Sequence, residues 1–210
     1  MKILTISDTI ERKLYHEQCK ECCADIDLIL SCGDLPFYYL EFLVTMVGVP
    51  LYYVFGNHHI GPMLTANGNE VHGPGGCENI DNKIVEFQGL LIGGFEGCML
   101  YNYGPKQYSE YQMRQKIFKM KFQLWKNKLF KKRYIDLVIT HAPPAGIHDQ
   151  PDRCHQGFKS FRTFIETYKP RYFVHGHTHR YSAKDPWQTQ YQETMVINTS
   201  GYRILEIENP

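Results

Sequence analysis

The sequence predicts an α/β protein in which two packed β-sheets are flanked by helices. Two observations lead to this fold class. Short apolar runs that end at Gly, Asp or His alternate with helical patterns, and further short runs are joined by tight turns. Strands that alternate with helices are typical of a partly parallel sheet, and strands joined by tight turns are typical of a second sheet of neighbouring strands. We therefore expect two packed sheets with helices outside. The length of 210 residues favours a single domain over residues 1–210.

The individual elements follow from these patterns in chain order. The first group of predicted strands comprises Ile3–Ser7, Asp27–Ser31, Leu51–Phe55, Ile135–Thr140 and Tyr172–His175. Helices are predicted between them, over Glu11–Cys23, Phe37–Val47 and Phe158–Tyr168. The second group of strands comprises Ile84–Phe87, Leu90–Gly93, Met195–Asn198 and Arg203–Ile207. The segment 61–76 is rich in Gly and Asn and is predicted to form a long loop.

The longest predicted helix is strongly basic. It begins with a capping box, Ser109-x-x-Gln112, and its apolar residues then recur at helical spacing. Nine Lys or Arg and no acid lie between Tyr111 and Ile135. We interpret this run first as a solvated outer face, and the alternative is an electropositive face for phosphate-rich or acidic partners.

Composition restricts the class of protein. The formal net charge is +1, and 43% of the residues are hydrophobic, which excludes a disordered or highly charged chain. The seven cysteines include Cys19-x-x-Cys22-Cys23, but no second pair completes a zinc site, so reduced cysteines on a helix are expected. Neither a secretory signal nor a run long enough to cross a membrane is present. We therefore expect a cytoplasmic protein without a membrane partner.

Polar residues gather where the predicted strands end. Ten histidines are present, and most of them fall in or beside such clusters. Because ligands bind outside the carboxyl ends of strands in open α/β sheets, these clusters are expected to form one site. The clustered side chains are Asp8, Asp34, Asn57, His58, His141, His175, His177 and His179.

The donor types in these clusters indicate a metal site. Carboxylate, amide and imidazole ligands suit Mn²⁺, Fe or Zn²⁺. Two aspartates and several histidines exceed the needs of one four-coordinate ion, so a pair of ions sharing a carboxylate is expected. Such a pair lowers the pKa of bound water and stabilises charge on a phosphoryl oxygen.

The order of these clusters resembles that of the calcineurin-like metallophosphoesterases, in a small bacterial-type branch. The blocks of that family are D-x-H, G-D, G-N-H, a lone His and G-H-x-H, each after a strand. Here they read Asp8-Thr9-Ile10, Gly33-Asp34, Gly56-Asn57-His58, His141 and Gly176-His177-Thr178-His179. The resemblance spans roughly Lys2 to Ile207 and implies the α/β/β/α sandwich of that family.

The resemblance also implies two divalent metal ions (Mn, Fe or Zn) and a role for each block. Asp34 would bridge the ions, with Asp8 and His179 on the first and Asn57, His141 and His177 on the second. His58 would contact the phosphate and assist the leaving oxygen as a general acid, and a metal-bound hydroxide would be the nucleophile. His175 is expected to have a structural or supporting role. Three further histidines are expected either at the rim of the site or at ordinary surface positions: His59, His148 and His155.

One position departs from the family pattern. The first block ends in Ile10, which cannot bind a metal, so the first site is expected to be weak. We expect an active phosphodiesterase or phosphomonoesterase, because His58 and the second-site ligands are present. The substrate would be a small phosphate ester or a nucleotide. The alternatives are a catalytically silent interaction module and a nuclease that uses the basic helix 114–133.

Overall fold

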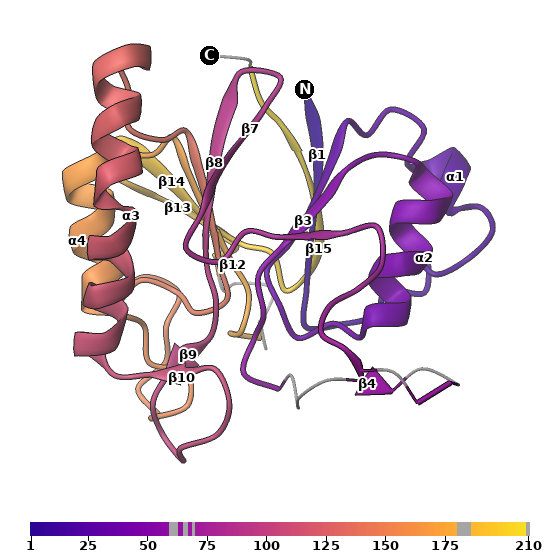
Figure 1. The fold of residues 1–210 in the computed structure, drawn as a ribbon, viewed down its shortest axis with the longest axis horizontal. Coiled ribbons are helices and arrows are strands. Elements are labelled where there is room, and N and C mark those ends of the chain that lie inside the picture. The colour runs from indigo at the N-terminus through magenta and orange to yellow at the C-terminus, as the bar shows by residue number, and fades with distance from the viewer. Residues whose placement is uncertain (59–62, 65–66, 69, 180–185, 209–210) are drawn as a thin grey trace.

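The structure, a computed structural model, describes residues 1–58, 63–64, 67–68, 70–179 and 186–208. It consists of two β-sheets packed face to face between two layers of helices (Figure 1). One helix layer contains α1 (Cys19–Cys22) and α2 (Phe37–Val47), and the other contains α3 (Glu110–Lys131) and α4 (Lys159–Tyr168). The predicted fold class, an α/β sandwich flanked by helices, is confirmed.

The first sheet has the strand order β15-β1-β2-β3-β6. Its strands are β1 (Lys2–Ser7), β2 (Leu28–Ser31), β3 (Leu51–Tyr53), β6 (Glu78–Asn79) and β15 (Gly201–Glu206). All neighbours are parallel except β15, which runs antiparallel to β1. The carboxyl ends of β1, β2 and β3 therefore lie at one edge of this sheet.

The second sheet has the strand order β13-β14-β12-β11-β8-β7. Its strands are β7 (Ile84–Phe87), β8 (Leu90–Phe95), β11 (Leu137–Thr140), β12 (Tyr172–His175), β13 (Gln188–Tyr191) and β14 (Thr194–Asn198). The four central strands are parallel, and the edge strands β7 and β13 are antiparallel to their neighbours. Two short pairs complete the fold: β4 (Met63–Leu64) with β5 (Glu70–Val71), and β9 (Cys98–Met99) with β10 (Gln107–Tyr108).

Each central strand divides its apolar residues between the core shared by the two sheets and the core under its own helix layer. In β2, Leu28 and Leu30 pack between the sheets, whereas Ile29 packs under α1 and α2. In β11, Leu137 also lies between the sheets, and Val138 packs beneath α3 and α4. Because successive side chains of a strand point to opposite faces, both faces of each sheet are buried. This explains why these strands read as continuous apolar runs.

Two local predictions require correction. The helix expected over Glu11–Cys23 is restricted to α1, and residues 11–18 form turns. Only Leu14 is buried among those eight residues, so tertiary packing provides no continuous apolar face to stabilise a helix there. The loop expected over 61–76 contains the short β4–β5 pair, although residues 61, 62, 65, 66 and 69 lie outside the described part.

Other predicted elements agree with the structure to within a few residues. The predicted bounds of α2, β7 and β12 match those observed, and α3 begins with the predicted capping box on Ser109 and Gln112. All seven cysteines are free thiols. No helix among the described ranges is both long and apolar enough to cross a bilayer.

Candidate metal centre

The carboxyl ends of β1 and β2 meet those of β11 and β12 across the sandwich. Asp8 directly follows β1, His141 directly follows β11, and His177 lies two residues after β12. Backbone contacts tie these ends together: the His177 amide donates to Asp8 Oδ2 at 2.9 Å, and the Gly176 amide donates to the His141 carbonyl at 3.0 Å. The polar clusters therefore converge as the sequence predicts.

Close backbone approach at this edge requires glycine. A Cβ at Gly176 would overlap the hydroxyl oxygen of Ser7 at the end of β1. Gly33 adopts φ +99°, and a Cβ there would meet the His141 ring nitrogen at 2.9 Å. Glycine has no Cβ, so it allows the close contact and adopts a positive φ without a steric penalty.

Three non-glycine residues of this edge have left-handed backbones. The φ angles are 63° at Asp8, 54° at Asp34 and 67° at His177. This conformation costs roughly 1–2 kcal/mol per residue and is rare outside glycine, asparagine and aspartate. Backbone strain of this kind concentrates at functional sites, where surrounding contacts hold it.

His141 is the centre of the cluster and is fully buried. Its Nδ1 donates to the Cys32 carbonyl at 2.8 Å. Its Nε2 faces two oxygens at 3.0 Å, Oδ2 of Asp34 and Oδ1 of Asn57. Three acceptors therefore surround one imidazole, so a positive charge is needed between Nε2 and the two side-chain oxygens.

In the metal-free protein that charge is a proton. Burial lowers the pKa of His141, but the negative charge of Asp34 and its hydrogen bond outweigh burial and raise the pKa to about 9. Burial likewise raises the pKa of Asp34, and the His141 charge and hydrogen bond outweigh it, lowering the pKa to about 2. A divalent ion at Nε2 would satisfy the same oxygens, because it would replace the proton.

His177 supplies a third donor. Its Nε2 donates to the Cys154 carbonyl at 2.7 Å, which leaves the Nδ1 lone pair free for a cation. Burial and the neighbouring His141 charge lower the pKa of His177 to about 3, so the ring is neutral as a metal ligand must be. One donor atom from each of Asp34, His141 and His177 lies within 4.8 Å of the others.

Asn57 and His58 come from the turn after β3. Asn57 is 4% exposed, and its Nδ2 donates to the Tyr101 hydroxyl at 3.3 Å while Oδ1 faces His141. The backbone amide of His58 donates to Asp34 Oδ1 at 2.9 Å. His58 itself is exposed and, with Asp34, lines a pocket of about 210 Å³. The predicted second-site ligands and His58 are thus adjacent.

The predicted first-site residues are less tightly gathered. Asp8 is joined to the cluster through the His177 amide, and burial raises the pKa of its carboxyl against the lowering effect of His141. His179 lies in a separate hollow with His148, and its Nδ1 is 3.5 Å from the Ser200 hydroxyl. Ile10 packs against the apolar cluster beneath α1 and α2. His179 is thus not among the donors grouped around Asp34 in the described structure.

Sequence reasoning did not anticipate two features beside the centre. Nε2 of the fully buried His175 forms a hydrogen bond of 3.0 Å with Nδ1 of His148. Nε2 of His148 in turn forms a hydrogen bond of 2.8 Å with the Thr189 hydroxyl. Cys154, His155 and His177 also offer donor atoms within 4.8 Å of one another. The pairing of His148 with His175 joins segments 27 residues apart, which no local pattern reveals. His59 lies outside the described residues.

The donor set fits a borderline divalent cation. A neutral imidazole, a carboxylate and an amide oxygen meet at one point, with a backbone carbonyl holding each of His141 and His177 in the required tautomer. Such carbonyl contacts are the usual support of metal-binding histidines. The buried Nε2 of His141, which faces two oxygens at 3.0 Å, is the observation that best fits a bound cation.

Comparison with known proteins identifies the family. A family model described as calcineurin-like phosphoesterase matches residues 1–181, and the chain belongs to this family. No curated protein sequence matches the chain.

Solved structures share its fold. One is similar with a TM-score of 0.64 and 13% identity, over 97% of this chain and 94% of its own. The protein TT1561 of Thermus thermophilus is similar with a TM-score of 0.60 and 17% identity, over 95% and 89% respectively. A single mutant of Vps29 from Entamoeba histolytica has a TM-score of 0.48 and 12% identity, over 100% and 87%. The likeness to the first two, at 13% and 17% identity, concerns the fold alone.

Proposed function

We propose that the protein is a metal-dependent phosphoesterase that hydrolyses a phosphodiester or phosphomonoester of a small molecule or nucleotide. The observation that carries the proposal is the position of His141 Nε2, 3.0 Å from both Asp34 and Asn57, in a cluster whose oxygen and nitrogen donors suit a divalent cation. Membership of the calcineurin-like phosphoesterase family supports this chemistry.

Four residues would hold the ion of the second site, and Asp34 would be shared with the ion of the first. The four residues of this second site are Asp34, Asn57, His141 and His177. The ion of the first site would rely on Asp8, Asp34 and His179, and is expected to bind more weakly because Ile10 contributes no ligand. Divalent Mn, Fe or Zn supplies Lewis acidity toward a phosphoryl oxygen and makes water a better nucleophile.

His58 would act on the leaving group. Its backbone amide donates to Asp34 Oδ1 at 2.9 Å, which holds this part of the chain beside the cluster, and its side chain is open to solvent. An imidazole beside the pocket can act as a general acid toward the leaving oxygen. No side chain in this scheme forms a covalent phospho-enzyme.

Metal content and turnover together test the proposal. The purified chain should retain Mn, Fe or Zn by elemental analysis and hydrolyse bis-p-nitrophenyl phosphate or p-nitrophenyl phosphate. Asp34→Asn should abolish turnover and reduce bound metal, because it removes the bridging carboxylate. Asp25→Asn, at an exposed carboxylate paired with Lys2, is the matched control and should leave both unchanged. Tight metal binding without hydrolysis of either ester would contradict an enzymatic function.

The role of His58 has its own comparison. His58→Ala should lower the rate by about 10²–10⁴-fold without loss of bound metal, as expected for a general acid that is not a ligand. His16→Ala, at another exposed histidine, should have no effect. An unchanged rate in His58→Ala would remove the proposed proton transfer while leaving the metal centre intact.

A catalytically silent interaction module is the second candidate. The observation that favours it is Ile10, whose side chain packs on an apolar cluster where the family pattern has a ligand. Fewer than one tightly bound ion per chain, together with no hydrolysis in added Mn²⁺, would support the module. A nuclease function would require phosphate binding by α3, and the experiment in the next subsection tests this as well.

A further inference from the structure

Helix α3 exposes an unusual amount of apolar surface. Of the ten large apolar side chains that are exposed among the described residues, six lie on this one helix. Their exposed fractions range from 53% at Trp125 to 79% at Phe122. The six are Tyr111, Phe118, Phe122, Trp125, Leu129 and Phe130. Concentrated apolar exposure of this kind marks an interaction surface rather than ordinary surface variation.

Five of these side chains form a single line along the helix. With about 100° of rotation per residue, the buried residues Met113, Met120 and Leu124 share one side. The exposed residues of the other side are centred about 150° away from them. This outer apolar stripe consists of Tyr111, Phe118, Phe122, Trp125 and Leu129. The helix is therefore apolar on two opposite sides, and the protein core accounts for only one of them.

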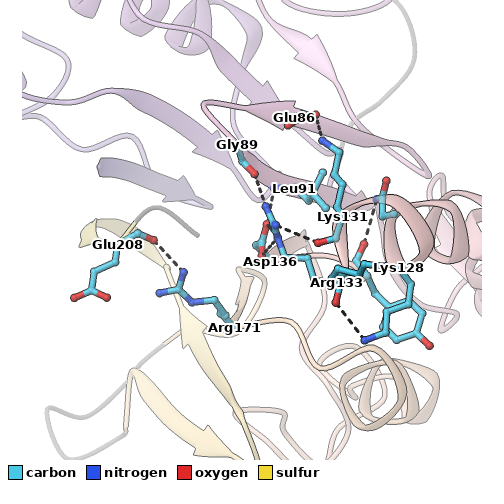
Figure 2. Close-up of polar contacts among 12 residues, drawn as sticks. Glu86, Gly89, Leu91, Lys128, Lys131, Arg133, Asp136, Arg171 and Glu208 are labelled. Atoms are coloured by element: carbon cyan, nitrogen blue, oxygen red, sulfur yellow. Dashed lines mark hydrogen bonds and ion pairs between the residues drawn. The ribbon is translucent and has the colours of Figure 1, made fainter.

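Some cations of this segment form ion pairs with carboxylates elsewhere in the protein. Lys116 binds Asp81 at 2.7 Å and lies 3.6 Å from Glu96. At the end of the helix, Lys131 pairs with Glu86, and Arg133 pairs with Asp136 while donating to the Gly89 carbonyl (Figure 2). These contacts fix α3 to the turn between β7 and β8 and to the start of β11.

The remaining cations of the helix flank the outer apolar stripe. On the same angular scale, one row lies about 70° from the stripe and another lies about 80° from it on the opposite side. The first row is Arg114, Lys121 and Lys128, and the second is Lys119 and Lys126; all five are exposed. Lys121 extends over the ring of Phe118, with its Nζ 5.9 Å from the ring centre. Long cationic side chains that lie along apolar surface in this way keep their charge in water while the stem contacts the apolar groups.

We propose that the outer face of α3 docks on an anionic lipid surface. The apolar stripe would enter the boundary between headgroups and acyl chains, and the two rows of cations would contact the phosphate and carboxylate groups of the lipids. A helix with Trp, Phe and Leu on one side and Lys beside them, lying flat on the membrane, has this composition. Anionic lipids attract each nearby Lys or Arg, so the charge of the face matches the proposed partner.

The arrangement favours lipid over two other occupants. A second copy of the same face would bring two sets of exposed cations together, which like-charge repulsion opposes. A nucleic-acid duplex is bound mainly through its phosphates, so cations dominate the surface that contacts it. On α3 the outermost groups are apolar, and the cations lie to either side of them. This proposal departs from the sequence-based expectation of no membrane partner.

Vesicle binding tests the proposal independently of any phosphoesterase activity. The probe is vesicles of phosphatidylcholine with and without phosphatidylserine, measured by co-sedimentation of the full chain. The chain should bind the serine-containing vesicles at least about tenfold more tightly than the neutral ones, and raising salt from about 0.1 M to about 1 M should weaken that binding. With Trp187→Phe, Trp125 becomes the sole tryptophan, and its emission should shift to the blue on binding.

Two variants separate the apolar and cationic contributions. The first, Phe118→Ser with Phe122→Ser and Leu129→Ser, should lose at least about tenfold in vesicle affinity. The second, Lys119→Glu with Lys126→Glu, should lose a similar factor. All five side chains are exposed, so the thermal midpoint should change little, and hydrolysis of a soluble ester should be unaffected. The matched control is Tyr103→Ser with Ile204→Ser, which removes exposed apolar groups elsewhere and should bind as wild type does.

Three results would overturn the proposal. The first is no binding to either vesicle. The second is vesicle binding that survives in the apolar variant, because charge alone would then explain it. The third is binding to single- or double-stranded oligonucleotides, lost in the charge variant, without binding to vesicles; that outcome would assign the face to nucleic acid instead.

Discussion

The Nε2 atom of His141 lies 3.0 Å from Oδ2 of Asp34, and both side chains are buried at the junction of the two sheets. Without a metal, this pair is an ion pair in which each partner stabilises the charge of the other, as the pKa of about 9 at His141 and of about 2 at Asp34 express. The same two atoms are the ligands that the proposed function requires. One contact therefore serves the stability of the metal-free fold and the binding of a cation.

Removal of His141 should affect both roles. In His141→Ala the Asp34 carboxylate remains buried without its cation, so the metal-free protein should lose about 3 kcal/mol of unfolding free energy at pH 7. The variant should also retain less metal after purification. Urea denaturation after chelation, together with elemental analysis, measures the two effects. His16→Ala is the control, and equal stability of both variants would show that the pair contributes nothing to the fold.

Restoring a histidine at position 10 should strengthen the first metal site. Ile10→His places an imidazole where the family pattern has a ligand, so bound metal per chain and the rate on bis-p-nitrophenyl phosphate should both rise, metal affinity by about tenfold or more. Ile204→His, at an exposed strand position, provides the comparison. If neither quantity changes, residue 10 has no influence on the metal centre in this protein.

The close approach at Gly176 should tolerate no side chain. In Gly176→Ala the new Cβ would collide with Ser7 at the end of β1, so strands from both sheets must move apart. We expect a loss of about 1–3 kcal/mol in unfolding free energy, together with loss of bound metal. In Gly75→Ala the nearest atom would be Glu41 Oε1 at an ordinary 3.5 Å, so this variant should unfold like wild type. A Gly176→Ala protein with unchanged stability would mean that the sheets adjust freely at this edge.

Lys116 should stabilise α3 in a pH-dependent way. Burial and the neighbouring Glu96 raise the pKa of Asp81, and Lys116 counteracts them. Lys116→Gln should destabilise the protein by about 2–3 kcal/mol at neutral pH, because the largely buried Asp81 loses its cation while Glu96 keeps Lys106. A raised folded-state pKa means that the folded state binds more protons, so the loss should shrink as the pH falls toward the pKa of Asp81.

The control for this prediction is Lys119→Gln, an exposed cation of the same helix. Unfolding followed by circular dichroism across the acid-to-neutral range measures both variants. A Lys116→Gln defect that stays constant with pH would show that the lysine acts through packing rather than charge.

The fold followed from the sequence where local patterns are strong. Short apolar runs and helical patterns predicted α2, β7 and β12 at their observed bounds, and the capping box marked the start of α3. Residues 11–18 were mistaken for helix because propensity there is not supported by burial. Helical stability in proteins comes mainly from packing of an apolar face, and no local pattern reports how much of a segment the rest of the fold will cover.

For the candidate site too, local patterns predicted some features and the tertiary structure determined others. The clusters after each strand indicated that Asp34, Asn57 and His141 would meet, because parallel strands bring their carboxyl ends to one edge. That His177 donates to Cys154, and that His148 reaches His175, depends on loops whose paths are set by packing. That His179 lines a different hollow from Asp34 and His58 likewise depends on how the chain turns after β12.

The sequence by itself determined the types of chemistry available: the metal-binding side chains, their order along the strands and the basic character of residues 111–135. Only the tertiary structure decided which cations are used inside the protein and which surround the outer apolar stripe of α3. The physical reason is that a helix has two sides, and a count of charges along the chain does not say which side the core will bury. Burial of Met113, Met120 and Leu124 settles that question and leaves the aromatic side facing outward.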